Sequence, residues 1–183
     1  MLLKGLCDRK QEAYEVLLNR YEAALYRFFY YSHRNHELAQ DQCGETFKIM
    51  IGAIDNLNKD NSLKSFLFGI ARNVMRRNWR TSELAKGDDI SLVEVVDESP
   101  SVIQQVAARE ELLFALNAIQ RFPDPEKQIL LLRFVENFKL EEIAEVMAIP
   151  LNSVKSHIHR SRKKLCKLLN ISQTHSSEND HVK

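Results

Sequence analysis

Glycine, proline and cysteine are all scarce in this 183-residue chain, at five, four and three residues. Few glycines and prolines disfavour a turn-rich barrel or sandwich of strands and favour helices. Cys7, Cys43 and Cys166 are odd in number and far apart, which suits a reducing compartment better than a disulfide framework. We therefore expect an all-α protein in the cytoplasm.

Long apolar runs and catalytic motifs are absent too. No stretch reaches the ~18 consecutive apolar residues of a membrane span, and the first ten residues lack the pattern of a secretory signal, so we expect no membrane insertion. No phosphate-binding loop, nucleophile elbow or dinucleotide motif is present, so we expect no enzyme activity, no small-molecule substrate and no cofactor. His33, His36 and Cys43 lack a fourth ligand for zinc, and we expect no metal site.

Charge is distributed unevenly behind a formal net charge of +1. Residues 1–80 carry a net +4 and residues 111–170 a net +3. Between them, residues 81–110 carry −5, and the tail 171–183 carries −1. Two basic segments around an acidic bridge indicate a polyanionic partner for the basic segments.

Apolar residues recur at steps of three and four along most of the chain, which is typical of amphipathic helices. The predicted helices cover 11–31, about 37–57, a segment that Asn61 or Ser62 begins, about 102–119, about 126–136, 140–147 and 152–169. The periodicity fades from Thr81 to about Ser101, where breakers and acidic residues gather.

These patterns predict two small helical domains joined by a flexible acidic linker, the second domain containing a helix-turn-helix. The expected boundaries are 1–80 for the first domain, 81–106 for the linker, 107–170 for the second domain and 171–183 for a polar, disordered tail.

The helix-turn-helix is predicted over residues 140–165. Its first helix offers small and apolar residues inward, and Pro150 cannot continue that helix, so it marks the turn. Asn152 or Ser153 can cap the second helix. Ala148 stands where many such motifs carry glycine, so the turn must avoid positive φ or tolerate strain.

The second helix of this motif has no carboxylate from 152 to 169, as contact with phosphates requires. The start of such a helix points at bases and its later part at the backbone. The candidate base readers are Asn152, Ser153, Lys155, Ser156 and His159, and the candidate phosphate contacts are Arg160, Arg162, Lys163 and Lys164. A solvated basic surface helix is the alternative interpretation.

A second basic segment reads SLKSFLFGIARNVMRRNWR, with no acid from Asn61 until Glu83. Phe66, Phe68 and Trp79 interleave with its charges, a mixture suited to stacked or unpaired bases. Ordinary core packing is the alternative for these aromatic residues.

Both segments together, with AQDQCGETFKIMIGAIDNL and EEIAEVMAIPLNSVKSHIHRSRKKL, resemble the extracytoplasmic-function sigma factors over most of residues 10–169. The resemblance implies an alternative sigma factor that binds core RNA polymerase and directs promoter-specific initiation. Region two would read the melted minus-ten element and region four the duplex minus-thirty-five element of promoter DNA. The implied partners also include the β′ clamp helices, the β flap and an anti-sigma factor.

The resemblance further assigns individual residues. Those expected at the polymerase clamp are Asp41, Gln42, Glu45, Thr46 and Phe47. Those expected at the minus-ten element are Asn56, Leu57, Asn58, Lys59, Asn61, Asn73, Arg76 and Arg77. Leu57 replaces an aromatic residue of many relatives, and leucine can wall a base pocket but offers no π face.

Two other functions remain open at this point. A stand-alone helix-turn-helix regulator would act without core polymerase and use its N-terminal helices for dimerisation or sensing. An inactive sigma-like interaction protein is a weaker alternative, suggested by Leu57 and the near-neutral total charge.

Overall fold

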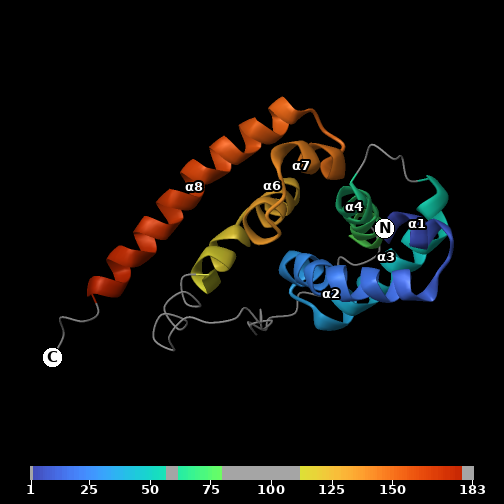
Figure 1. Cartoon of the computed structure of the whole chain (residues 1–183). Coiled ribbons are helices and arrows are strands. Elements are labelled where there is room, and N and C mark those ends of the chain that lie inside the picture. The colour runs from blue at the N-terminus through green and yellow to red at the C-terminus, as the bar shows by residue number, and fades with distance from the viewer. Residues whose placement is uncertain (1, 57–61, 80–111, 179–183) are drawn as a thin grey trace, which may run out of the picture.

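The computed structural model describes residues 2–56, 62–79 and 112–178, and every regular element in these ranges is helical, as predicted (Figure 1). The elements are α1 (Leu2–Cys7), α2 (Gln11–His33), α3 (His36–Ala53), the 3₁₀ turn η1 (Ile54–Asn56), α4 (Leu63–Trp79), a helix over 112–119, α6 (Asp124–Leu130), the π-helical turn η2 (Leu131–Val135), α7 (Leu140–Met147) and α8 (Leu151–Glu178). None of the described helices is long and apolar enough to cross a membrane. The predicted linker lies outside the described ranges.

Helices α1–α4 form what we call the N-terminal module. Arg34 ends α2 in the left-handed region (φ 58°), and its N–H donates to the Tyr30 carbonyl. The Asn35 side chain then accepts from the Leu38 N–H at 3.0 Å and starts α3. The predicted polar break between the two helices is therefore a tight turn that sets α2 and α3 side by side.

The start of α4 confirms one predicted cap. The Ser62 hydroxyl oxygen accepts from the Ser65 N–H at 2.9 Å, as N-capping requires. Leu67 and Phe68 are fully buried on the inner face of the helix. Phe68 is therefore core rather than a stacking platform for bases, which corrects the interpretation of its aromatic ring.

Helix α1 is an α-helix that the sequence did not predict. Six residues show too little periodicity, yet Leu6 is fully buried. A Cβ at Gly5 would lie 2.8 Å from the Cβ of Ala13, so glycine lets α1 approach α2 closely.

Residues 112–178 form the C-terminal module, in which the expected helix at 126–136 is divided. Regular α6 gives way to the π-turn η2, where the Glu136 N–H donates to the Leu131 carbonyl five residues earlier. Asn137 follows with φ 54° and reverses the chain toward α7. Asparagine tolerates this left-handed conformation better than most residues.

Helix α8 is longer than predicted. It continues to Glu178, past the expected end near 169 and through most of the tail that was expected to be disordered. The physical reason is that residues 169–178 contain no glycine or proline to interrupt the backbone hydrogen bonds. Figure 1 shows α8 extending as a rod beyond the rest of the C-terminal module.

One continuous hydrophobic core spans both modules. It joins Phe28 of α2 and Phe68 of α4 to Leu132 and Phe138 of the C-terminal module, and all four are fully buried. The sequence predicted two domains held only by a flexible connection. In the structure their apolar faces are packed against each other.

Candidate nucleic-acid interfaces

The helix-turn-helix is built by α7, a three-residue turn and α8. Ala148 ends α7 in the left-handed region (φ 48°, ψ 47°), so the turn does adopt the positive φ that alanine disfavours. The Pro150 carbonyl accepts from the N–H groups of Ser153 and Val154. Helix α8 thus begins at Leu151, and the predicted caps Asn152 and Ser153 lie inside its first turn.

Burial divides α8 into two faces. Val154 and Ser161 are buried against the module, and Ile158 and Leu165 pack against the same core, as the stripe predicted. The opposite face carries the predicted DNA-binding residues. Exposed there are Asn152, Lys155, Ser156, His159, Arg160, Arg162 and Lys163, while Ser153 is half-buried.

The charges on this face remain available to a ligand. No carboxylate among the described residues pairs with Lys155, Arg160 or Arg162, whereas His157 lies 3.6 Å from Glu126. The described carboxylates therefore leave these exposed cations of α8 able to pair with an external anion.

Two other polar side chains of α8 have contacts within the module. The Ser156 hydroxyl donates to the Asn152 carbonyl at 2.9 Å, and the Lys164 ammonium sits 4.8 Å from the centre of the Phe122 ring. Lys164 is thus held partly by the module's own aromatic side chain.

Helix α4 exposes the other predicted group, Asn73, Arg76 and Arg77. Arg77 forms an ion pair with Glu45 of α3, so two residues that were assigned to different partners bind each other. Burial and the neighbouring Arg76 charge lower the pKa of Arg72. Arg76 was also predicted to bind DNA, and no carboxylate among the described residues forms an ion pair with it.

The predicted base-capture loop is described only at its edges. Asn56 ends the turn η1, and Leu57, Asn58, Lys59 and Asn61 lie outside the described residues.

Of the five residues of α3 predicted to contact the clamp, some are accessible to solvent and others are buried. Asp41 is exposed and Glu45 half-exposed, and both border a shallow groove with Lys48 and Arg77. Gln42 and Thr46 are completely buried and Phe47 is 6% exposed, while the Thr46 hydroxyl donates to the Gln42 carbonyl at 2.7 Å. Direct contact with a partner is therefore open to Asp41 and Glu45, and the other three support the helix from inside.

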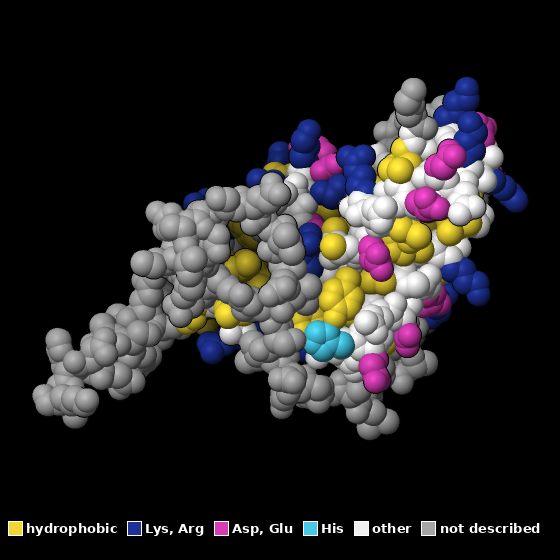
Figure 2. Space-filling model, turned by 60° about the horizontal axis from the view of Figure 1, so that its bottom comes forward, with side chains coloured by type: hydrophobic (Ala, Val, Ile, Leu, Met, Phe, Trp, Pro, Cys, Tyr) yellow, Lys and Arg dark blue, Asp and Glu magenta, His cyan; other side chains and the backbone are white. Residues whose placement is uncertain are grey.

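Figure 2 shows one face of the molecule, on which the described acidic and basic side chains are mixed. Carboxylates are scattered across it, and Lys and Arg lie mainly toward its margins. Such a mixed surface offers no continuous track for a phosphate backbone.

The sequence did not predict the contacts between the N-terminal and C-terminal modules. Arg27 of α2 donates both Nε and Nη2 to the Glu136 carboxylate, at 3.1 and 3.0 Å. In the sequence each looks like an ordinary surface charge, and 109 residues separate them. No local pattern could have revealed this pair.

Models of two protein families match the N-terminal and the C-terminal parts of the chain. Residues 17–84 match the model for sigma-70 region 2, and residues 115–165 match the model for sigma-70 region 4. The extracytoplasmic-function sigma factor SigW of Bacillus subtilis is 24% identical over 176 residues, which cover 91% of this chain and 94% of the relative. EcfG of Rhodopseudomonas palustris is 28% identical over 136 residues, covering 74% of this chain and 73% of the relative.

Solved structures give the same fold. The structure of CnrH in complex with the cytosolic domain of CnrY has a TM-score of 0.70 at 22% identity, covering 93% of this chain and 96% of that one. The sigma factor RpoE in complex with the anti-sigma factor NepR, from Bartonella quintana, has a TM-score of 0.67 at 20% identity, covering 90% and 98%. Both likenesses extend over the N- and C-terminal modules.

Proposed function

The chain belongs to the extracytoplasmic-function sigma factors of the sigma-70 family, and from this premise we infer how its exposed side chains divide the work of initiation. It is an alternative sigma factor whose regions bind core RNA polymerase and promoter DNA and direct promoter-specific transcription. Sigma factors are not enzymes. The match of residues 17–84 to region 2 leaves the stand-alone regulator without support.

Region four reads the duplex minus-thirty-five element through α8. The observation that carries this proposal is the exposed face of the helix between residues 152 and 168, which carries cations and no carboxylate. Lys155 and His159, near the N-terminal end, suit base edges in the major groove, and Arg160 and Arg162 suit phosphates. We assign region four to residues 107–170.

Region two, residues 1–80, reads the melted minus-ten element. Asn73 and Arg76 are exposed on α4 and can meet a single strand there. Arg77 must first leave Glu45. The loop residues Asn56, Leu57, Asn58, Lys59 and Asn61 keep their assignment to the flipped base as a proposal.

Polymerase binding falls to Asp41 and Glu45 at the β′ clamp helices, with the C-terminal module touching the β flap. Release of Arg77 from Glu45 would free a cation for DNA and a carboxylate for the clamp at the same time. Binding of polymerase and of the minus-ten strand would then favour each other, because both need this ion pair broken.

Control by an anti-sigma factor in the cytoplasm completes the proposal. The solved structure of RpoE contains the anti-sigma factor NepR. We extend this kind of partner to the present chain because its fold covers both modules of that sigma factor. The acidic segment 81–106 serves as the linker between the regions.

In vitro transcription tests the function. Purified protein with core polymerase should initiate from a cognate promoter that core alone ignores, found by footprinting the reconstituted holoenzyme. Normal core binding without any promoter-dependent product would point to the inactive sigma-like protein instead.

Core binding tests the clamp assignment. Asp41→Ala should weaken the affinity for core polymerase about tenfold or more, since it removes an exposed charge at the interface. Glu12→Ala, which removes an exposed carboxylate from α2, is the matched control. Equal affinity of the two variants would show that Asp41 is not part of the contact.

A further inference from the structure

The short helix α1 ends beside the turn that leads into the predicted base-capture loop. Helix α1 and η1 are in contact at the same end of the N-terminal module (Figure 1), and Leu6 of α1 and Ile54 of η1 are both buried in the core. Arg9 follows α1 by two residues, and its guanidinium lies 3.9 Å from the Asp55 carboxylate of η1. The next residue, Asn56, is the last described one before the loop. The charged end of Arg9 is therefore at the entrance of this loop.

The backbone of Arg9 adopts a conformation that arginine disfavours. Its φ is 55°, in the left-handed region. The Arg9 N–H donates to the Leu6 carbonyl at 3.1 Å, and the Lys10 N–H donates to the Gly5 carbonyl at 2.9 Å. These two hydrogen bonds form a Schellman motif, in which the residue at the position of Arg9 is usually glycine. Because glycine adopts positive φ without the steric cost of a Cβ, folding alone would favour glycine here.

Contacts within the described part of the chain do not account for an arginine at this position. The Arg9 and Asp55 side chains are 78% and 64% exposed, and an exposed pair at this distance adds little to stability. Arg34, which ends α2 with a φ of 58°, lies 5.7 Å from the centre of the Tyr31 ring and donates to Asn117 at 3.1 Å. Arg9 has no comparable neighbour among the described residues. A strained residue that the fold does not use is typical of a binding site.

The chemistry of Arg9 suits a phosphate group. A guanidinium presents a planar fork of N–H donors that matches the oxygens of a phosphate, and it is less strongly hydrated than an ammonium. Exchange of Asp55 for a phosphate loses little, because the existing pair is exposed. Burial of Leu6 fixes α1 against the core, so the backbone that carries Arg9 is held in place before any ligand binds.

The path of a captured nucleotide leads past this arginine. A base that is drawn out of its stack stays joined to the phosphates on either side of it. The sugar-phosphate backbone of a nucleotide held in the base-capture loop must therefore cross the entrance of the loop, where Arg9 and Asp55 lie. Grooves that bind single strands without sequence preference use cations to follow this backbone.

We propose that Arg9 binds a backbone phosphate of the melted minus-ten strand, next to the nucleotide that the loop captures, and exchanges Asp55 for DNA as its counterion. This inference rests on the proposed function of region two, which assigns the minus-ten strand to this end of the module. Helix α1 then has a second task besides packing: it presents a DNA-binding arginine.

The salt dependence of DNA binding tests the contact. The probe is a duplex with a single-stranded overhang that carries the minus-ten element of a footprinted promoter, bound by reconstituted holoenzyme. Arg9→Ala should weaken binding roughly fivefold or more and decrease the slope of log affinity against log salt by about 0.7, as for one phosphate of a single strand. Arg9→Lys, which keeps the charge, should retain most of the slope. Lys4→Ala removes an exposed cation of the same helix that forms no ion pair with η1, and it should change neither quantity.

Neutralising single phosphates identifies the partner of Arg9. Each phosphate of the overhang is replaced in turn by an uncharged methylphosphonate. At one position beside the captured base, the replacement should weaken binding of the wild-type holoenzyme and have little further effect on Arg9→Ala. Such coupling distinguishes a direct contact from a general effect of charge or of an altered fold.

Arg9→Gly separates folding from binding. Glycine removes both the strain and the charge, so this variant should unfold at a higher urea concentration than the wild-type protein and bind the probe as weakly as Arg9→Ala. A lower unfolding midpoint would show that arginine is present to stabilise the fold and would overturn the inference.

Two further results would reject the assignment of Arg9 alone: equal salt slopes for the wild-type protein and Arg9→Ala, or no phosphate whose effect depends on Arg9. In both cases the wild-type holoenzyme still binds the minus-ten probe, and the proposed function stands. A wild-type holoenzyme that starts transcription but has no affinity for the minus-ten overhang would reject the proposed role of region two, and the Arg9 contact with it.

Discussion

The backbone conformation of Ala148 determines where α7 ends and in which direction α8 begins. Its positive φ (48°) ends α7 and aims α8, although a Cβ in this region costs about 1–2 kcal/mol. The turn is nevertheless made, because Ile143, Val146 and Met147 of α7 are buried on one side of it and Val154 of α8 on the other.

Replacing Ala148 with glycine should therefore stabilise the protein. Relief of strain exceeds the greater freedom of glycine in the unfolded chain, for a net gain of about 0.5–1 kcal/mol. Urea unfolding measures the change. Ala23→Gly, at an exposed interior position of α2, should have the opposite sign and cost about 1 kcal/mol.

His33 makes the stability of the folded protein depend on pH. Burial lowers its pKa below 6.5, while Asp124 and Gln42 oppose this shift and Lys127 adds to it. The unfolded chain binds the proton more readily than the folded one, so this contribution to stability is present above pH 6.5 and is lost as the pH falls below it.

His33→Gln should remove this pH-dependent contribution to the free energy of unfolding. The free energy of unfolding of the wild-type protein should fall more steeply between pH 6.5 and about pH 5 than that of the variant. Chemical unfolding at several pH values gives both slopes. Parallel curves would mean that His33 does not sense pH through burial.

Helix α8 performs two tasks on two faces. Its apolar side anchors the helix-turn-helix to the module core, and its outer side keeps cations without protein counterions. The helix is longer than expected and continues to Glu178. This leaves the division between the two faces unchanged, because the predicted DNA contacts end at Lys164.

Arg162→Ala should weaken promoter binding by the holoenzyme across sequences. If Arg162 binds a phosphate, the slope of log affinity against log salt should decrease by about one unit. Lys4→Ala removes one exposed positive charge from α1 and should leave the slope unchanged. A titration in which both variants keep the wild-type slope would contradict the phosphate assignment.

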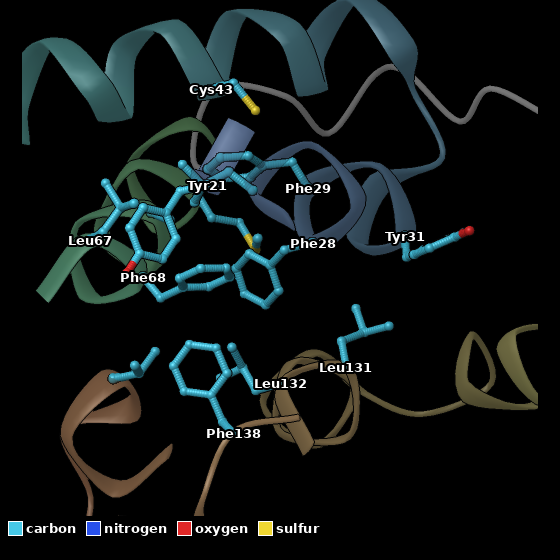
Figure 3. Packing of buried hydrophobic residues seen from close by; sticks show 14 of the residues in the cluster. Tyr21, Phe28, Phe29, Tyr31, Cys43, Leu67, Phe68, Leu131, Leu132 and Phe138 are labelled. Carbon is cyan, nitrogen blue, oxygen red and sulfur yellow. The ribbon is translucent and has the colours of Figure 1, made fainter. Parts of the chain in front are cut away.

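The whole molecule has a single core in which aromatic rings of both modules meet (Figure 3). Small domains with one core unfold in one cooperative step. Two modules connected only by a linker would unfold independently. The contact between the modules therefore governs how the free protein denatures.

Calorimetry should accordingly show one transition for the free wild-type protein and two for Glu136→Arg, which breaks the buried ion pair with Arg27. Glu145→Arg, an equal change of charge at an exposed site on α7, should keep the single transition. Two separate transitions in the wild-type protein would show that the modules are not thermodynamically coupled.

The sequence alone determined the local structure, because periodicity and capping act over a few residues. The stripe of α2, the cap at Ser62 and the span of α7 were all predictable, and the family followed from the two basic motifs. The π-turn and the short helix α1 were not, because neither has a repeating pattern long enough to recognise.

Tertiary structure alone decided which of the predicted residues can reach a partner. Gln42 and Thr46 are hidden because α3 turns that face toward the core, and Arg77 is paired because α4 lies beside it. Arg27 and Glu136 meet only after a chain of 109 residues folds back. Such pairings depend on which apolar faces pack together, and that is a property of the assembled core rather than of any segment.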